Sequence, residues 1–258
     1  MLPLRVSGIF YLFRIMKIAL LGYGRMGKAI ERLARERGHE IVLIVDETNR
    51  ASCTDEQLKQ ADVAIEFTTP VVAVDDYGWC FRNGVPVVSG TTGWLERWSE
   101  VTELCNETGG AFFYASNYSI GVNIFFHLNR WLAKTMAGVD NYKVFVEETH
   151  HVHKLDAPSG TAITLAEGIL EEHPKYSSWK LDEGEVKAGE LPIKAKREGE
   201  VPGIHAVTYK SEVDEIQIYH SAFSRDGFAQ GAVMAAEFLA GKKGVYGMDD
   251  LLELKVKN

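Results

Sequence analysis

The feature that most constrains the fold is a glycine-rich turn between a buried strand and a helix. Residues 17–21 form an apolar run, as expected for a parallel strand that is buried on both faces. The run leads into G-Y-G-R-M-G at 22–27, and a helical pattern follows that stops at Gly38. A second strand is predicted at 41–45, directly before Asp46. Strand, turn, helix and strand in this order predict a βαβ unit.

The glycines of this turn are spaced as in a dinucleotide-binding fingerprint. Gly22 allows the tight turn, Gly24 lets the backbone approach a pyrophosphate, and Gly27 lets the helix pack on the strand. Asp46 stands where a carboxylate can accept a hydrogen bond from a ribose 2′-hydroxyl. A lone G-x-G-x-x-G is weak evidence and would also fit a simple βα turn. The full context favours binding of a nicotinamide or flavin nucleotide.

The preference between NADH and NADPH depends on the charges near Asp46. A carboxylate there repels a 2′-phosphate and so favours NADH. Arg25 and Arg50 are close enough in the sequence to offset that repulsion. The sequence therefore leaves the preference open.

The alternating strand and helix pattern continues and predicts a Rossmann-like, doubly wound parallel sheet. Further strands are predicted at 62–67, 86–89 and 111–115, with helices at 71–83 and through Trp98 and Leu104. Their ends, T-T-P and G-T-T-G among them, place hydroxyl and backbone N–H groups at the carboxyl edge of the sheet, where ligands bind. Any one ending could be ordinary turn chemistry. Several in register favour a ligand site.

The pattern changes after residue 123 and predicts a second, α+β domain. Predicted elements are helices at 124–136 and 162–170, a strand at 142–146, and an antiparallel pair at 206–212 and 215–219. The polar stretch 177–203 is interpreted as loops and one edge strand. Strands of period two leave one face of their sheet free for partners or subunits.

The domain boundaries follow from these elements. Residues 16–117 and 225–258 are predicted to form the dinucleotide-binding domain, because helices at 228–239 and in D-D-L-L-E-L are expected to return to it. Residues 118–224 are predicted to form a substrate-binding and oligomerisation domain. Residues 1–15 are expected to be an N-terminal extension, with Met16 as the natural start.

Residues 147–162, E-E-T-H-H-V-H-K-L-D-A-P-S-G-T-A, combine chemical groups that suit an anionic substrate. Histidines can transfer a proton, Lys154 is a cation, and the helix predicted after Pro-Ser-Gly-Thr offers a free N-terminus. A solvated surface loop is the plain alternative. A metal site is not predicted, because the adjacent His150 and His151 cannot easily share one tetrahedral ion and no H-E-x-x-H or C-x-x-C accompanies them.

Charge and cysteine usage limit the partners and the compartment. With 28 basic and 36 acidic residues the net charge is −8, which argues against a nucleic-acid surface. The three cysteines, Cys53, Cys80 and Cys105, suggest no disulfide framework, so a reducing cytoplasm is expected. The apolar patch at 9–13 is too short to span a membrane.

Several motifs together resemble one family. They are E-x-H-H-x-x-K-x-D-A-P-S-G-T-A at 148–162, G-R-M-G at 24–27, S-G-T-T-G at 89–93, S-N-Y-S-x-G-V-N at 116–123 and R-x-G-F-A-x-G-A at 225–232. From about Met16 to its end the chain resembles the 4-hydroxy-tetrahydrodipicolinate reductases (dihydrodipicolinate reductases) of the diaminopimelate branch of lysine biosynthesis. The resemblance implies reduction of a cyclic imine-type dicarboxylate by NADH or NADPH, in a homotetramer built through the second domain's sheet.

The resemblance also implies residue roles. His150 resembles the proton donor of the family and Lys154 its catalytic partner. His151, Gly160 and Thr161 resemble substrate contacts. Cofactor contacts are implied for Gly22, Tyr23, Gly24, Arg25, Met26, Gly27, Asp46, Gly90, Thr91, Thr92, Ser116, Asn117, Tyr118 and Ser119. The chain departs from the family at its first turn, where many members have G-x-x-G-x-x-G, and at Glu66, where Asp is usual.

Two other functions compete with this interpretation. A dehydrogenase of the aspartate or homoserine type would share the nucleotide domain but gives no reason for the His-His-x-x-Lys segment. A nucleotide-sensing or scaffold protein would keep the fold without catalysis, since a fold alone never fixes function. Such a protein is expected to lose its proton-transfer residues, whereas His150 and Lys154 are both present.

Overall fold

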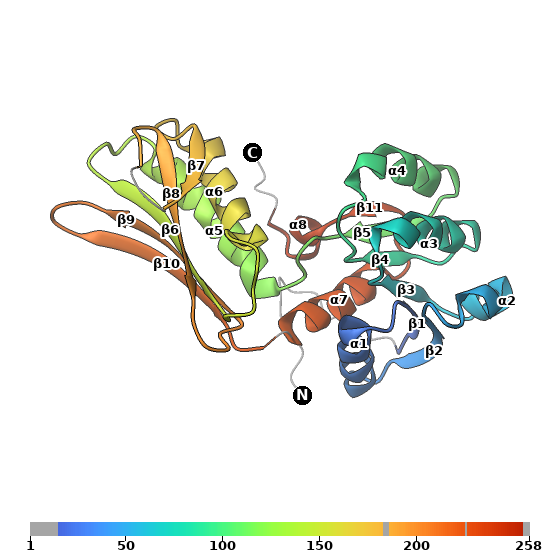
Figure 1. The fold of residues 1–258 in the computed structure, drawn as a ribbon. Coiled ribbons are helices and arrows are strands. Elements are labelled where there is room, and N and C mark those ends of the chain that lie inside the picture. The colour runs from blue at the N-terminus through green and yellow to red at the C-terminus, as the bar shows by residue number, and fades with distance from the viewer. Residues whose placement is uncertain (1–14, 183–185, 225, 255–258) are drawn as a thin grey trace. The chain divides into compact units, whose positions relative to one another are not determined.

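The computed structural model describes residues 15–182, 186–224 and 226–254, which divide into two compact units (Figure 1). One unit contains the chain up to Tyr118 together with the segment from Phe228 onward, and the other is Ser119–Gly227. The N-terminal extension predicted at 1–15 lies almost wholly outside the described residues.

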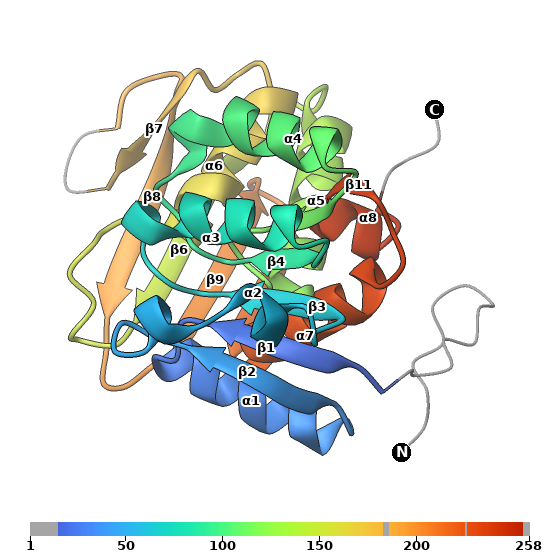
Figure 2. The same ribbon diagram turned by 90° about the vertical axis from the view of Figure 1, so that its right-hand side faces the viewer.

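The first unit contains the predicted doubly wound sheet, with six parallel strands in the order β11-β5-β4-β3-β1-β2. Helices α3 and α4 cover one face, and α1 and α7 cover the other (Figure 2). The strands are β1 (Lys17–Leu21), β2 (Glu40–Val45), β3 (Val63–Glu66), β4 (Val87–Ser89), β5 (Ala111–Tyr114) and β11 (Gly244–Tyr246). The helices are α1 (Arg25–Glu36), α2 (Asp55–Leu58), α3 (Pro70–Arg82), α4 (Trp98–Glu107), α7 (Asp226–Leu239) and α8 (Met248–Leu251), with short 3-10 turns η1 (Arg50–Ser52) and η2 (Leu95–Arg97).

The core of this unit explains its strand sequences. All of β3 and nearly all of β1 are buried, because helices cover both faces of the sheet. Aromatic side chains of α3, of β5 and of the residue before η2 pack together, with Tyr77, Trp94 and Phe112 in mutual contact. The strands predicted in this unit are found to within one or two residues. The short strand β11 was not predicted.

The second unit has a mixed five-stranded sheet in the order β10-β9-β6-β8-β7. Strand β9 is antiparallel to β6 and β10, whereas β8 is parallel to β6 and β7. Helices α5 and α6 pack on one face (Figure 1), around a core that includes Phe125, Leu165 and Val207. The elements are α5 (Ile120–Met136), β6 (Lys143–His150), α6 (Gly160–Glu172), β7 (Ser178–Leu181), β8 (Glu190–Arg197), β9 (Gly203–Lys210) and β10 (Glu215–Ala222).

Three predictions for this unit were wrong in extent. Strand β6 continues through His150, although residues 147–150 were assigned to a loop. The stretch 177–203 contains two strands, and β8 lies inside the sheet and not at its edge. Helix α5 begins at Ile120, before the predicted residue 124, because the Ser119 hydroxyl caps it by accepting from the Val122 N–H at 3.3 Å.

No helix among the described residues has the length and apolar composition needed to cross a membrane. The three cysteines are free thiols, two of them buried.

Candidate functional site

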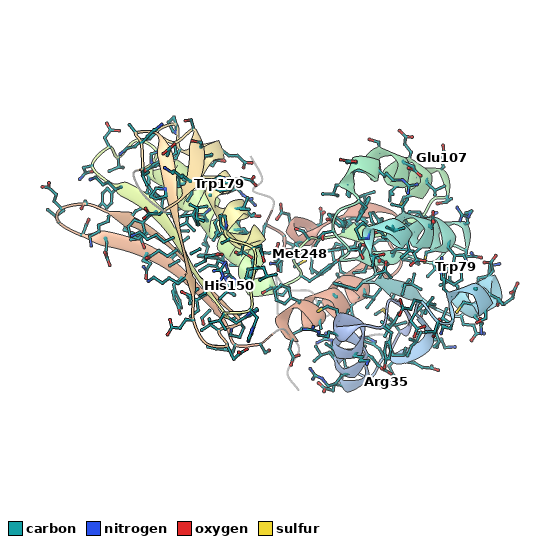
Figure 3. The ribbon with its side chains drawn as sticks, viewed as in Figure 1. Arg35, Trp79, Glu107, His150, Trp179 and Met248 are labelled. Atoms are coloured by element: carbon teal, nitrogen blue, oxygen red, sulfur yellow. The ribbon has the colours of Figure 1, made fainter. Side chains whose placement is uncertain are left out.

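The buried face of β6 changes from apolar to ionisable along its length. Val144 and Val146 belong to the core, and Glu148 and His150 continue the same face because side chains alternate along a strand. The register places His205 of β9 opposite Glu148, and Arg197 of β8 opposite His150. Three strands therefore bring four ionisable side chains to one end of the sheet. His150 is labelled in Figure 3.

Glu148 is an ionised carboxylate at the centre of this group. It is 1% exposed and accepts hydrogen bonds from the Ser159 N–H at 3.0 Å and from the Arg197 guanidinium at 3.2 Å, while the His205 Nε2 lies 3.7 Å away. Burial raises the pKa of Glu148, but hydrogen bonds from His205 and Ser159 outweigh it and lower the pKa to about 2. At neutral pH this position therefore carries a full negative charge.

His150 lies beside that carboxylate and is nearly buried. Its Nδ1 is 3.5 Å from a Glu148 oxygen, and its ring meets the His205 ring edge to face at 5.0 Å. Burial lowers the pKa of His150 to about 4, although the charge of Glu148 opposes the shift. A Cβ at Gly203 would lie 3.2 Å from the His150 Nε2. The ligand-free protein thus holds a neutral imidazole, with its Nε2 beside a residue that has no side chain.

Arg197 fixes the loop that carries Lys154. The Arg197 guanidinium donates to the Lys154 carbonyl at 3.2 Å and to the Asp156 carbonyl at 2.6 Å. The Lys154 ammonium donates to both oxygens of the Asp156 carboxylate, at 2.8 and 2.7 Å. The Asp156 side chain is 63% exposed, so a ligand carboxylate can replace it at little cost.

The N-terminus of α6 supplies an anion-binding group in the same unit. Ser159 caps the helix, with its hydroxyl accepting from the Ala162 N–H at 3.2 Å. Its hydroxyl also lies 3.2 Å from the His205 Nε2. Gly160 and Thr161 begin the helix, and their N–H groups precede its first intrahelical bonds. A Cβ at Gly160 would meet nothing within 4 Å, so this end of the helix is open to a ligand.

His151 and His153 lie outside the group around Glu148. The His151 ring is half-buried and lies 6.0 Å from the His153 ring. His153 is exposed and its Nε2 is 3.0 Å from a Glu200 oxygen. The structure therefore links His150 to the Lys154 backbone through Glu148 and Arg197, whereas among the described residues the Nδ1 of His151 has no hydrogen-bond partner.

Glu148, His150 and His205 also meet the geometry of a metal site, since one atom of each lies within 4.8 Å of the others. The surrounding charges argue for a different ligand. Glu148 is already held by Arg197 and Ser159, and a divalent cation would face the guanidinium of Arg197. A cationic rim and a helix N-terminus suit a carboxylate better than a metal ion.

In the first unit, the three fingerprint glycines have three separate steric reasons. Gly22 has φ +94° and a Cβ there would lie 2.1 Å from the Phe67 carbonyl oxygen. A Cβ at Gly27 would lie 2.3 Å from the Gly22 oxygen, so the helix packs against the turn. Gly24 is the N-cap of α1 and has open space around it, which fits a pyrophosphate at the helix N-terminus. These residues fit a dinucleotide.

Buried Glu66 ties together the ligand-facing ends of β3 and β4. It accepts from the Thr68 N–H at 2.8 Å, from the Thr91 hydroxyl at 2.6 Å and from the Ser89 hydroxyl at 2.7 Å. The ring of Phe67 fills the space where a side chain at Gly90 would stand, 2.1 Å from its Cβ position. Glu66 thus fixes the loops that contain Gly90 and Thr91.

The other predicted cofactor contacts differ in how available their side chains are. Arg25, Thr92 and Ser116 are exposed, and Met26, Asp46, Asn117 and Ser119 are half-buried. The hydroxyl of buried Tyr118 donates to the Ser89 carbonyl at 2.6 Å, and the Tyr23 hydroxyl is bonded to Glu31. These two hydroxyls are committed within the protein, so any cofactor contact by Tyr23 or Tyr118 has to use other atoms.

Sequence reasoning assigned no role to Glu148, Ser159, Arg197 or His205. A signal existed for His205, because this histidine directly precedes the alternating run that was predicted as a strand at 206–212. Arg197 had none, because it lies in the polar stretch that was interpreted as loops and one edge strand.

Comparison with known proteins follows the division into two units. The N-terminal family model of dihydrodipicolinate reductase matches residues 16–118, and the C-terminal model matches 121–252. A 4-hydroxy-tetrahydrodipicolinate reductase of Christiangramia forsetii is 50% identical over 244 residues, covering 94% of this chain and 100% of the relative. One of Staphylococcus aureus is 36% identical over 248 residues, covering 92% and 100%.

Solved structures confirm the predicted fold class. A dipicolinate-bound dihydrodipicolinate reductase from Paenisporosarcina has a TM-score of 0.74 at 24% identity, covering 92% of this chain and 99% of that one. An amine dehydrogenase from Mycobacterium smegmatis has a TM-score of 0.58 at 13% identity, covering 91% and 95%. Both cover more than nine tenths of this chain and therefore share its fold.

Proposed function

This chain belongs to the dihydrodipicolinate reductase family, and on that premise we propose that it reduces 4-hydroxy-tetrahydrodipicolinate to tetrahydrodipicolinate with NADH or NADPH. In the net reaction the substrate gains a hydride and a proton and loses water. The observation that supports this most is the group around Glu148, where a nearly buried imidazole lies beside a held carboxylate and near two cationic side chains.

We assign the proton transfer to His150. Its imidazole is neutral in the ligand-free protein, since burial lowers its pKa to about 4. A substrate with two carboxylates brings negative charge next to the ring and raises that pKa, so binding favours the imidazolium that can donate a proton. The charge of Glu148 acts in the same direction.

Lys154 and the N-terminus of α6 are proposed to hold the two substrate carboxylates. Lys154 exchanges the exposed carboxylate of Asp156 for that of the substrate. The N–H groups of Gly160 and Thr161 receive the second carboxylate at the helix N-terminus. His151 is a proposed substrate contact by its resemblance to the family alone.

The glycine-rich turn, Asp46 and the loops fixed by Glu66 are proposed to hold the nucleotide. Gly24 admits the pyrophosphate, and Asp46 accepts from the adenosine ribose. When bound, the nicotinamide supplies the hydride. The residues Gly90, Thr91, Thr92 and Ser116–Ser119 are the remaining proposed contacts.

The test is oxidation of reduced nicotinamide, followed by its near-ultraviolet absorbance. The substrate is generated in situ from pyruvate and aspartate semialdehyde by the preceding synthase. We expect synthase-dependent oxidation that falls by about 10²–10⁴-fold in kcat for His150→Gln, with nucleotide binding unchanged. His153→Gln is the matched control, because this histidine of the same segment is exposed and forms its ion pair with the equally exposed Glu200. Near-native kcat in His150→Gln would remove His150 from the reaction.

We further infer a homotetramer in the cytoplasm. In the described part of the second unit, the sheet face opposite α5 and α6 carries no helix (Figure 1). Tyr219 of strand β10 is exposed on that face, because it alternates with Ile218, which packs against the core. Free cysteines agree with a reducing compartment. Light scattering after size exclusion tests the assembly, and a monomeric mass would refute it.

A further inference from the structure

Arg50 lies close in the sequence to Asp46, the residue proposed to bind the adenosine ribose. It begins η1, one turn beyond Asp46, and its backbone N–H donates to the Asp46 carbonyl at 3.0 Å. In sheets of this kind an acid at the end of the second strand accepts from the ribose 2′-hydroxyl, whereas a nearby arginine accommodates a 2′-phosphate. The direction of the Arg50 side chain therefore decides which ribose the site accepts.

That side chain is held by helix α3. The Arg50 Nη2 is 2.5 Å from Oδ1 of Asp76, and its guanidinium carbon lies 4.2 Å from the centre of the Trp79 ring. The contact with Asp76 is an ion pair without good hydrogen-bond alignment. Trp79 is itself fixed, because its indole N–H donates to Asp55 at 2.7 Å. The guanidinium thus lies between the carboxylate of Asp76 and the aromatic face of Trp79, and both contacts stabilise its position.

Release of Arg50 would leave Asp76 without its counter-charge in the interior. The Asp76 side chain is only 3% exposed, whereas that of Arg50 is 35% exposed. Removing one partner of a buried ion pair leaves an uncompensated charge and is strongly unfavourable. The pair therefore persists unless a ligand offers Arg50 a better partner and Asp76 takes up a proton.

Asp46 stays charged beside this occupied arginine. Its Oδ1 accepts from the Thr48 N–H at 2.8 Å, from the Thr48 hydroxyl at 2.6 Å and from the Asn49 N–H at 3.2 Å. The hydrogen bonds from Thr48 lower the pKa of Asp46. Arg25, the other cation near in sequence, begins α1 at the pyrophosphate end of the fingerprint.

We propose that this protein discriminates against NADPH in favour of NADH, and that Asp76 sets this preference as a positioning residue by holding Arg50 away from the ribose. The inference rests on the proposed function only in assuming that a nicotinamide nucleotide binds the glycine-rich turn. It assigns to a buried aspartate on α3 a role in cofactor choice.

Binding of NADH and NADPH to the full-length protein without substrate tests the proposal, with fluorescence as the signal. We expect wild type to bind NADH on the order of tenfold more tightly than NADPH, as one uncompensated like-charge contact produces. Asp76→Asn keeps the shape of the side chain but frees Arg50, and it should reduce that ratio several-fold. The double variant Arg50→Gln/Asp76→Asn should restore it. Asp75→Asn, the same charge change at the exposed neighbouring residue, should leave the ratio as in wild type.

Each outcome decides. Equal or tighter binding of NADPH to wild type overturns the proposal without need of any variant. An unchanged ratio of NADH to NADPH affinity in folded Asp76→Asn also overturns it. A double variant that behaves like Asp76→Asn does so too, because the change in affinity would then not come from Arg50. If Asp76→Asn fails to fold, the wild-type ratio and the double variant, which removes both charges, still decide. Failure to bind either nucleotide would instead contradict the proposed function.

Discussion

At the scale of single residues, the state of His150 depends on whether substrate is present. Burial lowers its pKa to about 4 in the free protein, and nearby positive charges of His205, Lys154 and Arg197 add to the shift. A general acid must be protonated to act, so activity falls as the pH rises through its pKa. The substrate's negative charge is expected to move that pKa upward.

This predicts two different pH profiles for one enzyme. The profile of kcat/KM reports the free protein and that of kcat the substrate complex. The alkaline fall of kcat should therefore occur at higher pH than that of kcat/KM. Steady-state rates across the pH range, with stability checked at each end, measure both. If kcat and kcat/KM fell at the same alkaline pH, substrate binding would not change the pKa of His150.

At the scale of elements, strand β6 combines a structural and a chemical role on one face. Val144 and Val146 pack in the core. Two residues further along the strand, Glu148 places a charge on the same face. Glu148 joins this strand to the Ser159 cap of α6 and to Arg197 at the end of β8. Its carboxylate is therefore a junction of three elements.

The junction predicts the effect of Glu148→Gln. The amide cannot compensate Arg197, so we expect the free energy of unfolding of this unit to fall by ~3 kcal/mol, as when one partner of a buried ion pair is removed. The pKa of His150 should also fall, because the charge of Glu148 raises it. Denaturant unfolding and the pH profile of kcat measure the two effects.

Glu147→Gln provides the matched control for this variant. Glu147 is the adjacent residue on the opposite face of β6, and its partner Lys196 lies 4.0 Å away with a largely exposed side chain. A surface pair of this kind is worth at most ~1 kcal/mol. If Glu147→Gln were as harmful as Glu148→Gln, the effect would belong to the strand and not to the buried group.

Sequence patterns predicted those elements whose signal is local. The run at 17–21 and the three glycines after it carry their own steric logic, and β1 and α1 were found where predicted. The stretch that contains β8 was predicted to form loops and one edge strand because it is polar and rich in lysine, and only pairing with β6 and β7 makes β8 internal. The roles of Arg197 and His205 depend on the register between distant strands. No local pattern contains that information.

At the scale of the whole molecule, the last long helix is tied to the first sheet by a partly buried ionic cluster. Glu237 of α7 accepts two hydrogen bonds from Arg37, at 2.8 and 2.7 Å, and its Oε1 is 2.9 Å from the His39 Nε2. The partners are about two hundred residues apart in the sequence, at separations of 200 and 198. The cluster therefore joins the C-terminal part of the first unit to its N-terminal part, although the whole second unit lies between them in the sequence.

Glu237→Gln should loosen this closure in a pH-dependent way. Burial raises the pKa of Glu237, but hydrogen bonds from His39 and Arg37 outweigh it, and the pKa lies below its ordinary value of 4.5. The ionised cluster thus stabilises the fold fully above that value, and the contribution is lost as the pH falls through the folded pKa. Hydrogen exchange of the α7 amides should be faster in the variant at pH 7, and the difference should vanish in acid. An equal difference at both pH values would exclude the charge as its cause.

The shared face of β6 has a consequence for how this family can change over generations. A gene copy that no longer has to support the reaction could lose His150, which ends the strand, but not Glu148, whose loss leaves the half-buried Arg197 uncompensated. The residue needed for the reaction and the residue needed for the fold are therefore only two positions apart in the sequence. Descendants that abandon the chemistry while keeping the architecture should be recognisable by a retained glutamate next to a vanished histidine.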